Sequence, residues 1–408
     1  MPTITDRKSI LKQPLFTLPL AEELLTTYGS PLYVYQSDIL RQTIARITNA
    51  ITYPQTKFCF ASVTNGNIAL LQIFQACGWG LHANTPGDIY LGIQAGFAPE
   101  KIVYSGSNLH KSEMEQVLRW GVTTLNFDSL SQLQLCCEVY QFLRENQQIL
   151  LQPSLGLRLN LPELTGDSRI GVRSTEFPDA ISLAKTAGLK ISGLHFYRGT
   201  GTNSTAAFTQ VIDTVIAVAQ QLPDWEYLDF GGGFGYPYRG GTAFDWELFG
   251  AELTSRIERL DRQIELIVEP GRSAVAGCAT LLAQVVSAKW QEAKQIVGVD
   301  TTVANLSVPS VHGGYREIYT WNCRDPLHLT DVCGNTTYSR DYLGKNCQLP
   351  ALRVGEILAI LDVGAYGYAM SSHFLHRPKP AEVLLENERH RLIRRREDYS
   401  VLLANQVF

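Results

Sequence analysis

The chain has 408 residues, of which 45% are hydrophobic and 18% charged, with a formal net charge of −4 and a pI near 6.1. This balance is typical of a globular protein and excludes the basic surface that nucleic acids or anionic membranes attract. No apolar run is long enough to span a membrane, and the first residues lack a signal-peptide core. The eight cysteines show no CxxC pair or zinc spacing, so we expect free thiols in the cytoplasm and no metal site.

Short apolar runs alternate with amphipathic stretches from Lys57 to Ser273. The runs predict eight strands: Phe58–Ser62, Leu81–Thr85, Ile102–Ser105, Thr123–Phe127, Leu155–Leu159, Ile191–Tyr197, Trp225–Phe230 and Ile264–Val268. Several stretches between them have helical spacing and end at a glycine, as helices commonly do. Eight strands that alternate with helices are typical of an α/β fold, the (β/α)8 TIM barrel, over residues 36–273. A doubly wound open sheet is the alternative.

The pattern changes after Ser273. The stretches Leu281–Ala288, Gln295–Gly298, Val354–Leu361 and Glu382–Leu384 read as strands separated by turn residues. We therefore predict an antiparallel β domain built from residues 1–35 and 274–408, with the N-terminal segment Leu32–Tyr35 as one of its strands. The charged stretch Leu392–Glu397 is interpreted as a solvated strand or helix end.

Two motifs at strand ends carry the chemistry. Leu228–Gly235 reads LDFGGGFG, and Glu269–Arg272 reads EPGR. Consecutive glycines leave backbone N–H groups that can surround an anion, and a guanidinium suits a phosphate because it donates two parallel hydrogen bonds. Barrels commonly hold phosphate at strands seven and eight. The alternatives are a tight packed turn for the glycines and a structural ion pair for Glu269.

Together with these motifs, further segments resemble one family. They are PLYVY (31–35), NFDS (126–129), SRIG (168–171), HFYRGT (195–200), GYREI (314–318), DVGAYGYAMSS (362–372) and RPKPAEV (377–383). In this order they resemble the alanine-racemase-like (fold type III) pyridoxal-phosphate decarboxylases of the ornithine, diaminopimelate and arginine decarboxylase group, and among them the diaminopimelate branch most closely.

The resemblance implies a cofactor, pyridoxal 5′-phosphate, and a homodimer whose sites are shared across the interface. The residues implied to bind the cofactor are Tyr197, Thr200, Gly231, Gly232, Gly233, Glu269, Gly271, Arg272 and Tyr366. Glu269 would pair with the pyridine nitrogen, because a protonated ring withdraws electrons. Tyr197 stands where the family has a histidine that stacks on the ring, and packing at the barrel mouth is its alternative role.

The family carries its cofactor-binding lysine after the first barrel strand, in a segment like YAVKAN-x-N. This chain reads FASVTNGN there, so Asn65 and Asn67 match and Val63 occupies the lysine position. Lys57 lies near the opposite end of that strand, roughly 20 Å away at about 3.3 Å per residue, and Lys111 follows the third strand. We therefore expect any pyridoxal phosphate to bind without a covalent tether.

Further departures concern the substrate. Thr337 stands for the family's catalytic cysteine and Tyr338 for the acid beside it, which makes them the catalytic candidates of this chain. A hydroxyl ionises far less readily than a thiol, and Tyr338 removes the charge that would pair with a distal ammonium. The substrate-binding candidates are Arg198, His82, His312 and Arg316, and Val308 replaces a substrate-binding arginine. Structural roles are the alternative for the two histidines and a surface ion pair for Arg198.

Two functions follow from this pattern. The first is an amino-acid decarboxylase, a carboxy-lyase, that works without the lysine tether. The second is a non-catalytic pseudoenzyme that binds a ligand or regulates a relative through dimerisation. A different phosphorylated ligand at the same site is a third interpretation.

Overall fold

The structure is a computed structural model that describes residues 13–14, 16–149, 151–166, 168–199, 201–322, 324, 326–387 and 389–407. The chain forms two compact units. The barrel unit contains residues 41–237 and 241–274, and the β unit contains the described residues up to 40 together with 238–240 and those from 275 onward. Within the described residues, no helix combines the length and the apolar composition needed to cross a membrane.

The barrel unit is a closed ring of eight parallel strands, which confirms the predicted fold class. The strands are β2 (Thr56–Ala61), β3 (Gly80–Ala83), β4 (Ile102–Tyr104), β5 (Thr124–Phe127), β6 (Ser154–Arg158), β7 (Ile191–His195), β8 (Tyr227–Asp229) and β9 (Glu265–Val268). Each overlaps one of the eight predicted apolar runs. The ring closes where β9 pairs with β2, since Lys57 lies opposite Ile267. The open doubly wound sheet is therefore wrong.

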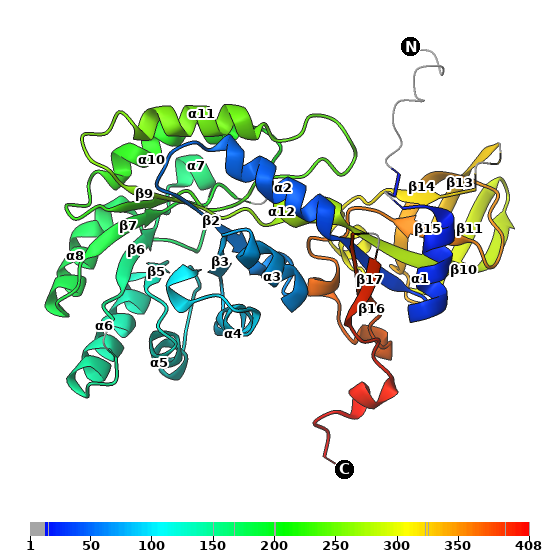
Figure 1. Cartoon of the computed structure of the whole chain (residues 1–408), viewed down its shortest axis with the longest axis horizontal. Helices are drawn as coiled ribbons and strands as arrows, with labels where there is room; N and C mark the ends of the chain where they lie inside the picture. The colour runs from blue at the N-terminus through cyan, green and yellow to red at the C-terminus, as the bar shows by residue number, and fades with distance from the viewer. Residues whose placement is uncertain are drawn as a thin grey trace. The chain divides into compact units, whose positions relative to one another are not determined.

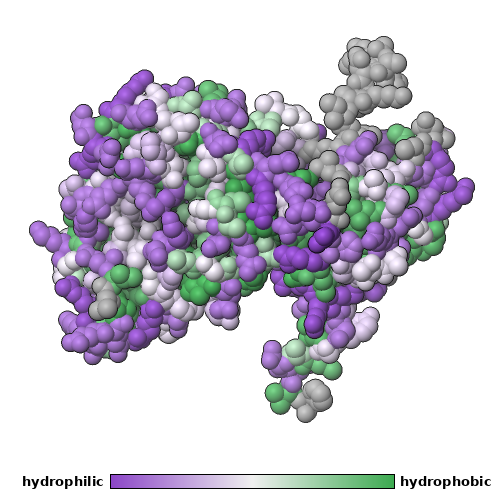
Figure 2. Space-filling view, in the orientation of Figure 1, coloured by the Kyte–Doolittle hydropathy of each residue, from purple (hydrophilic) through white to green (hydrophobic). Residues whose placement is uncertain are grey.

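Helices surround these strands (Figure 1), and in the view of Figure 2 their outer faces carry mainly hydrophilic residues. The longer ones are α2 (Ser37–Ala50), α3 (Ile68–Ala76), α4 (Pro86–Ala95), α5 (Lys111–Arg119), α6 (Leu130–Glu145), α8 (Phe177–Thr186), α10 (Ile212–Ala219) and α11 (Trp246–Ile257). Short helices α7 (Pro162–Thr165), α9 (Ala206–Thr209) and α12 (Arg272–Val275) lie in the loops. Local signals fix their ends: the Asn67 side chain caps α3, and Thr85 with Asp88 forms a capping box on α4.

The β unit is a mixed nine-stranded sheet. Its main path runs β14 (Tyr342–Pro350), β13 (Leu327–Cys333), β11 (Lys294–Val299), β10 (Ala279–Gln291), β1 (Leu32–Gln36), β16 (Ala381–Glu386) and β17 (Arg389–Arg394). Strand β15 (Ile357–Ile360) pairs with β10 and with β12 (Ile318–Thr320). The N-terminal strand β1 joins this sheet as predicted. Most pairs are antiparallel, but β1–β16 and β11–β13 are parallel. Helices α1 (Leu18–Tyr28) and α13 (Val308–Val311) also belong to this unit.

Two glycines make room for one aromatic ring inside the barrel. A Cβ on Gly193 of β7 would lie 1.8 Å from the Cζ of Tyr227, and a Cβ on Gly156 of β6 would lie 2.3 Å from its hydroxyl. The Tyr227 side chain therefore fills space that side chains at both glycines would otherwise need. Its hydroxyl donates a 2.8 Å hydrogen bond to the Asn126 Oδ1.

An aromatic cluster fixes the segment that follows β8. Phe208, which is fully buried, has its ring centroid 4.7 Å from that of Phe234, 5.2 Å from Phe244 and 5.8 Å from Phe249. Phe234 directly follows the three glycines of the LDFGGGFG motif. Burial of these rings therefore holds one end of the glycine loop to helices α9 and α11.

Truncating this cluster is expected to destabilise the barrel unit strongly. Phe208→Ala removes a fully buried ring and leaves a cavity, so the free energy of unfolding should fall by about 3–5 kcal/mol. Phe142→Ala is the matched control, because that ring is 50% exposed and should cost less than about 1 kcal/mol. Urea unfolding followed by tryptophan fluorescence measures both. Equal losses for the two variants would contradict the role of the cluster.

Candidate active site

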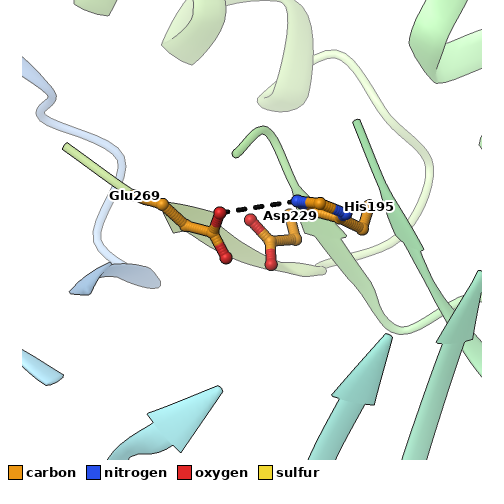
Figure 3. A group of neighbouring side chains, drawn as sticks. All are labelled: His195, Asp229 and Glu269. Atoms are coloured by element: carbon orange, nitrogen blue, oxygen red, sulfur yellow. Dashed lines mark ion pairs between the residues drawn. The ribbon is translucent and has the colours of Figure 1, made fainter. Parts of the chain in front are cut away.

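The ends of four barrel strands bring together two imidazoles and two carboxylates. His82 lies on β3, His195 ends β7, Asp229 ends β8 and Glu269 follows β9. All four are buried. The Glu269 carboxylate lies between the imidazoles, with Oε2 at 3.4 Å from His195 Nε2 and Oε1 at 3.5 Å from His82 Nε2. Figure 3 shows three of these side chains converging at the strand ends.

Strand register explains this convergence. Arg158 on β6 lies opposite His195 on β7, and His195 lies opposite Asp229 on β8. Parallel strands in register align their carboxyl ends, which is where barrel enzymes place their chemistry. Arg158, His195 and Asp229 therefore occupy equivalent positions on three adjacent strands. Arg158 and His195 stand at the predicted strand ends where chemistry was expected, but no site role was predicted for them or for Asp229.

Asp229 is held by hydrogen bonds at both oxygens. The Asn126 amide donates to Oδ2 at 3.0 Å, and the backbone N–H of Gly231 donates to Oδ1 at 3.0 Å. Asn126 in turn accepts from Tyr227 at 2.8 Å and donates to Ser105 Oγ at 3.0 Å. This network spans β4, β5 and β8, and it ties the carboxylate to the first residue of the glycine loop.

Burial shifts the pKa of every titratable group in this cluster. It raises the pKa of Glu269 to about 7, against smaller lowering effects of Asp229 and Arg158. Burial, and next the charge of Glu269, raise the pKa of Asp229 well above its usual range. Burial also lowers the pKa of His195 to about 4 and that of His82 well below its usual range. Two adjacent buried carboxyls therefore retain a proton near neutral pH, while both imidazoles are neutral and their contacts to Glu269 are not full ion pairs.

The three glycines after Asp229 form a loop that tolerates no side chain. A Cβ on Gly231, Gly232 or Gly233 would lie 2.1, 2.6 or 2.4 Å from the carbonyl oxygens of Phe196, Glu269 or Gly199, respectively. Gly231 and Gly233 also have φ values of +64° and +97°, which favour glycine. The packed turn and the anion cradle are therefore compatible. Among the described residues, the N–H groups of Gly232 and Gly233 donate to no acceptor.

Arg272 lies beside the segment after β7 that contacts the glycine loop. A Cβ on Gly201 would be 3.0 Å from the Arg272 Nε, so the guanidinium runs along the segment that follows β7. Gly199 of the same segment contacts Gly233. The structure thus brings Gly231–Gly233 and Arg272 to the same segment. Thr200, the remaining phosphate candidate here, lies outside the described residues.

Gly271 brings the EPGR turn against the segment after β2. A Cβ there would lie 2.7 Å from Thr64 Cγ2 and 3.0 Å from the Ala61 Cβ. Between them, Val63 lies in the short 3-10 helix η2 (Ser62–Thr64), and its side chain is 45% exposed. Val63 therefore stands next to the EPGR turn, at the strand end where the resemblance placed the family's lysine.

The two lysines considered as substitutes lie elsewhere. Lys57 lies near the start of β2, and its Nζ is 2.5 Å from the carboxylate of Glu265 at the start of β9. Both residues are therefore at the end of the barrel strands opposite to Val63. Lys111 is the first residue of α5, and its side chain is exposed. Neither position corresponds to the end of β2.

Tyr197 and Arg198 follow β7. The Arg158 guanidinium lies over the Tyr197 ring, 5.1 Å from its centroid, so the tyrosine already stacks on one face. Arg198 donates from Nε to the Ala207 carbonyl at 2.9 Å and from Nη1 to the Leu164 carbonyl at 2.7 Å. These bonds give Arg198 a structural function between two loops. Its role in substrate binding stays a prediction.

The other predicted site residues belong to the β unit. Thr337 and Tyr338 lie on the loop between β13 and β14, which buried Asp341 organises by accepting from Thr336 and from the Val303 N–H. His312 is the exposed C-cap of α13, Arg316 is buried, and Tyr366 has a φ of +59°. Their catalytic, substrate-binding and phosphate-binding roles stay predictions.

The cluster also offers three ligand atoms to a metal. One donor atom each from His195, Asp229 and Glu269 lie within 4.8 Å of one another. The sequence predicted no metal site because it lacks cysteine and histidine spacing, a criterion that does not detect ligands from separate strands. Arg158 supplies positive charge to the same carboxylates, since it lowers the pKa of Glu269. A cation is thus already present beside them.

Comparisons with known proteins agree with this geometry. Residues 37–276 match the family model described as pyridoxal-dependent decarboxylase, pyridoxal binding domain. The chain is 32% identical to a diaminopimelate decarboxylase from Methanothermobacter thermautotrophicus, over 95% of this chain and 94% of that protein. It is 29% identical to one from Aquifex aeolicus, over 94% and 93% of the two chains. The crystal structure of diaminopimelate decarboxylase from Helicobacter pylori complexed with L-lysine superposes with a TM-score of 0.86 at 28% identity, covering 94% of this chain and 98% of that one.

The raised pKa of Glu269 predicts a pH-dependent stability difference. Between pH 4.5 and about 7 the unfolded carboxyl ionises while the folded one keeps its proton, so the free energy of unfolding falls as pH rises through this window. Glu269→Gln lacks this titration. Its free energy of unfolding relative to the wild type should therefore rise by on the order of 3 kcal/mol between pH 4.5 and pH 8. Urea unfolding at both values tests this.

His195 titrates with the opposite sign, because its lowered pKa makes stability rise with pH, but it is present in both proteins and largely cancels in the difference. The pKa of Asp229 falls when the Glu269 charge is removed, which adds to the expected gain of Glu269→Gln in the same direction. Exposed Glu138 is the control: Glu138→Gln should shift the wild-type profile very little. A wild-type minus Glu269→Gln difference that is constant with pH would show that the carboxyl is ionised in the folded chain throughout.

Proposed function

Because the chain belongs to the pyridoxal-dependent decarboxylase family, we propose that it binds pyridoxal phosphate non-covalently at the barrel mouth and decarboxylates an amino acid without a lysine tether. The cofactor of this family is pyridoxal phosphate. One observation carries the proposal: the Glu269 Oε1 is buried without a hydrogen-bond partner, in a cluster next to the glycine loop and Arg272 that we propose to bind the phosphate. A buried acceptor of this kind requires a donor.

The residues present fit two parts of the cofactor. The N–H groups of Gly232 and Gly233, with Arg272, would hold the phosphate, because they combine backbone donors with a bidentate cation. Glu269 would accept a hydrogen bond from the protonated pyridine nitrogen. When bound, the cofactor supplies an electron-withdrawing ring that stabilises negative charge at the amino-acid Cα.

The surrounding residues prepare Glu269 for this role. The proton that the two carboxyls retain near neutral pH can be given up when a cationic nitrogen approaches, since an added positive charge favours the ionised form. Neutral His82 and His195 flank the carboxylate without neutralising it. Tyr197, backed by Arg158, presents a ring that would cover one face of the ligand.

The residues do not fit the third part, the aldehyde. Val63 has no amine, so the chain's own groups must retain the ligand by non-covalent contacts alone. A lysine tether also exchanges amines rapidly, and its absence predicts slow turnover. The relatives act on diaminopimelate, and one binds L-lysine, but Tyr338 in place of an acid removes the partner of a distal ammonium. The proposed substrate is therefore an amino acid that has no second, distal ammonium group. We propose that the protein binds it as a homodimer.

Cofactor binding is the first test. Equilibrium dialysis with pyridoxal phosphate should show one site per chain that is lost on extensive desalting. Glu269→Gln should weaken binding by about tenfold or more, because a charge-assisted hydrogen bond is replaced by a neutral one. Glu138→Gln is the matched control. Absence of any cofactor binding by the wild type would sink the proposal.

Restoring the amine is the second test. In Val63→Lys the cofactor should remain with the protein through desalting and become covalently attached on borohydride reduction, as a mass increase shows. Val63→Met, of similar length but without an amine, should behave like the wild type. If Val63→Lys is not modified although it binds cofactor, the position of Val63 relative to the aldehyde has been assigned wrongly.

Turnover is measured as carbon dioxide release from a panel that includes diaminopimelate, lysine and amino acids without a second amine. Carbon dioxide release by the wild type supports decarboxylation. If Glu269→Gln no longer releases carbon dioxide, the activity is assigned to this site. Cofactor binding without release from any substrate would favour the non-catalytic, ligand-binding alternative.

A further inference from the structure

The β unit contains a cavity of about 340 Å³ lined entirely by its own residues. Its lining includes four cationic side chains, Arg239, Arg316, Arg340 and Lys345, and no carboxylate. Tyr315 and Tyr342 supply aromatic walls. This volume lies within the range of small-molecule sites, roughly 300–1,000 Å³. Charge of a single sign around a concave surface concentrates its field and attracts the opposite charge.

The four cationic groups of this cavity outnumber the acids that act on its lining residues. Within the part of the chain that the structure describes, Arg239, Arg340 and Lys345 form no ion pair with a carboxylate. Two acids, Glu317 and Asp331, act on the lining residue Cys347, and of these only Asp331 is paired with a cation among the described residues. The Tyr315 hydroxyl donates to Glu317, and Lys294 lies 2.8 Å from Asp331.

The aromatic rings hold the cationic groups in place. The Arg239 guanidinium lies 4.8 Å from the centroid of the Tyr315 ring, and the Lys345 ammonium lies 3.9 Å from that of Tyr342. The Arg316 guanidinium lies 3.8 Å from the Tyr238 ring centroid and donates to the Tyr315 carbonyl at 2.7 Å. Cation–π contacts orient a cation without cancelling its charge, so Arg239 and Lys345 keep their positive charge available to a ligand.

Glycines allow the backbone to form the cavity. Gly313 turns the chain after α13 with a φ of +66°. A Cβ on Gly344 would lie 2.7 Å from the Cys347 Sγ and 2.7 Å from the Ile318 Cδ1, so a side chain there would displace both of these groups. The Ser310 hydroxyl donates to the Arg340 carbonyl, which links the α13 side of the cavity to the loop before β14. The cavity is thus supported by contacts of the fold.

We propose that this cavity is a binding site for a small polyanion, a metabolite that carries two or more phosphate or carboxylate groups. Three arginines supply planar donors that match either oxyanion, and the two tyrosines match an apolar or ring portion between them. The cavity shares Arg316 with the predicted substrate-binding residues, and its other twelve lining residues are not among the predicted site residues.

Isothermal titration with pyrophosphate and with citrate tests the proposal on the full chain. The two probes distinguish phosphate from carboxylate recognition, and acetate serves as a monoanion control. We measure an Arg272→Gln protein in parallel, because phosphate can also bind at the glycine loop. The expected result is a polyanion site that persists in Arg272→Gln and weakens steeply as salt is raised.

The double variant Arg340→Gln/Lys345→Gln should weaken that site by about tenfold or more. Arg391→Gln is the matched control, since Arg391 is exposed on β17 of the same unit and lies outside the cavity. Urea midpoints confirm that all variants fold. Two results would overturn the proposal. In the first, polyanion binding is lost in Arg272→Gln and kept in the double variant, which assigns the binding site to the barrel. In the second, the full chain binds neither polyanion.

Discussion

Asp229 has hydrogen bonds on both carboxylate oxygens, and much of the barrel mouth depends on them. One bond comes from Asn126, which reaches across from β5, and the other from the first glycine of the loop. The first fixes the carboxylate relative to the barrel interior. The second fixes the loop relative to the carboxylate. Glu269 then lies beside a group that cannot rotate away, and burial without a mobile counter-charge raises its pKa.

The same arrangement separates binding from chemistry. The proposed binding of the cofactor by the glycine loop, Arg272 and Glu269 requires only backbone geometry and charges that this chain retains. Transfer of an amine requires a nucleophile at the end of β2, where the exposed side chain is Val63. Nothing in the packing excludes a longer side chain there, since Val63 is partly exposed. The chemistry of this position is therefore set by one residue type rather than by the fold.

Much of the barrel was predictable because each strand is a short apolar run bounded by helical periodicity, a pattern that local sequence carries. Strands β12, β13 and β14 were not predicted: their exposed and buried residues mix irregularly, and β13 and β14 pair with register shifts. For the site, the glycines and EPGR were found because each motif is contiguous. Arg158, His195 and Asp229 were missed as a group, because their adjacency arises from pairing between β6, β7 and β8. Sequence spacing contains no record of that register.

The ring of Tyr227, set against Gly156 and Gly193, has a consequence for how this barrel can change. Because the three positions share one volume, a larger residue at either glycine fits only if residue 227 becomes smaller. A smaller residue at 227 would also remove the hydroxyl that Asn126 accepts from, and Asn126 in turn holds Asp229. A change of side-chain size inside the barrel thus also changes the hydrogen bonds that hold Asp229 at the barrel mouth. Redesign of the interior and redesign of the site are one problem in this protein.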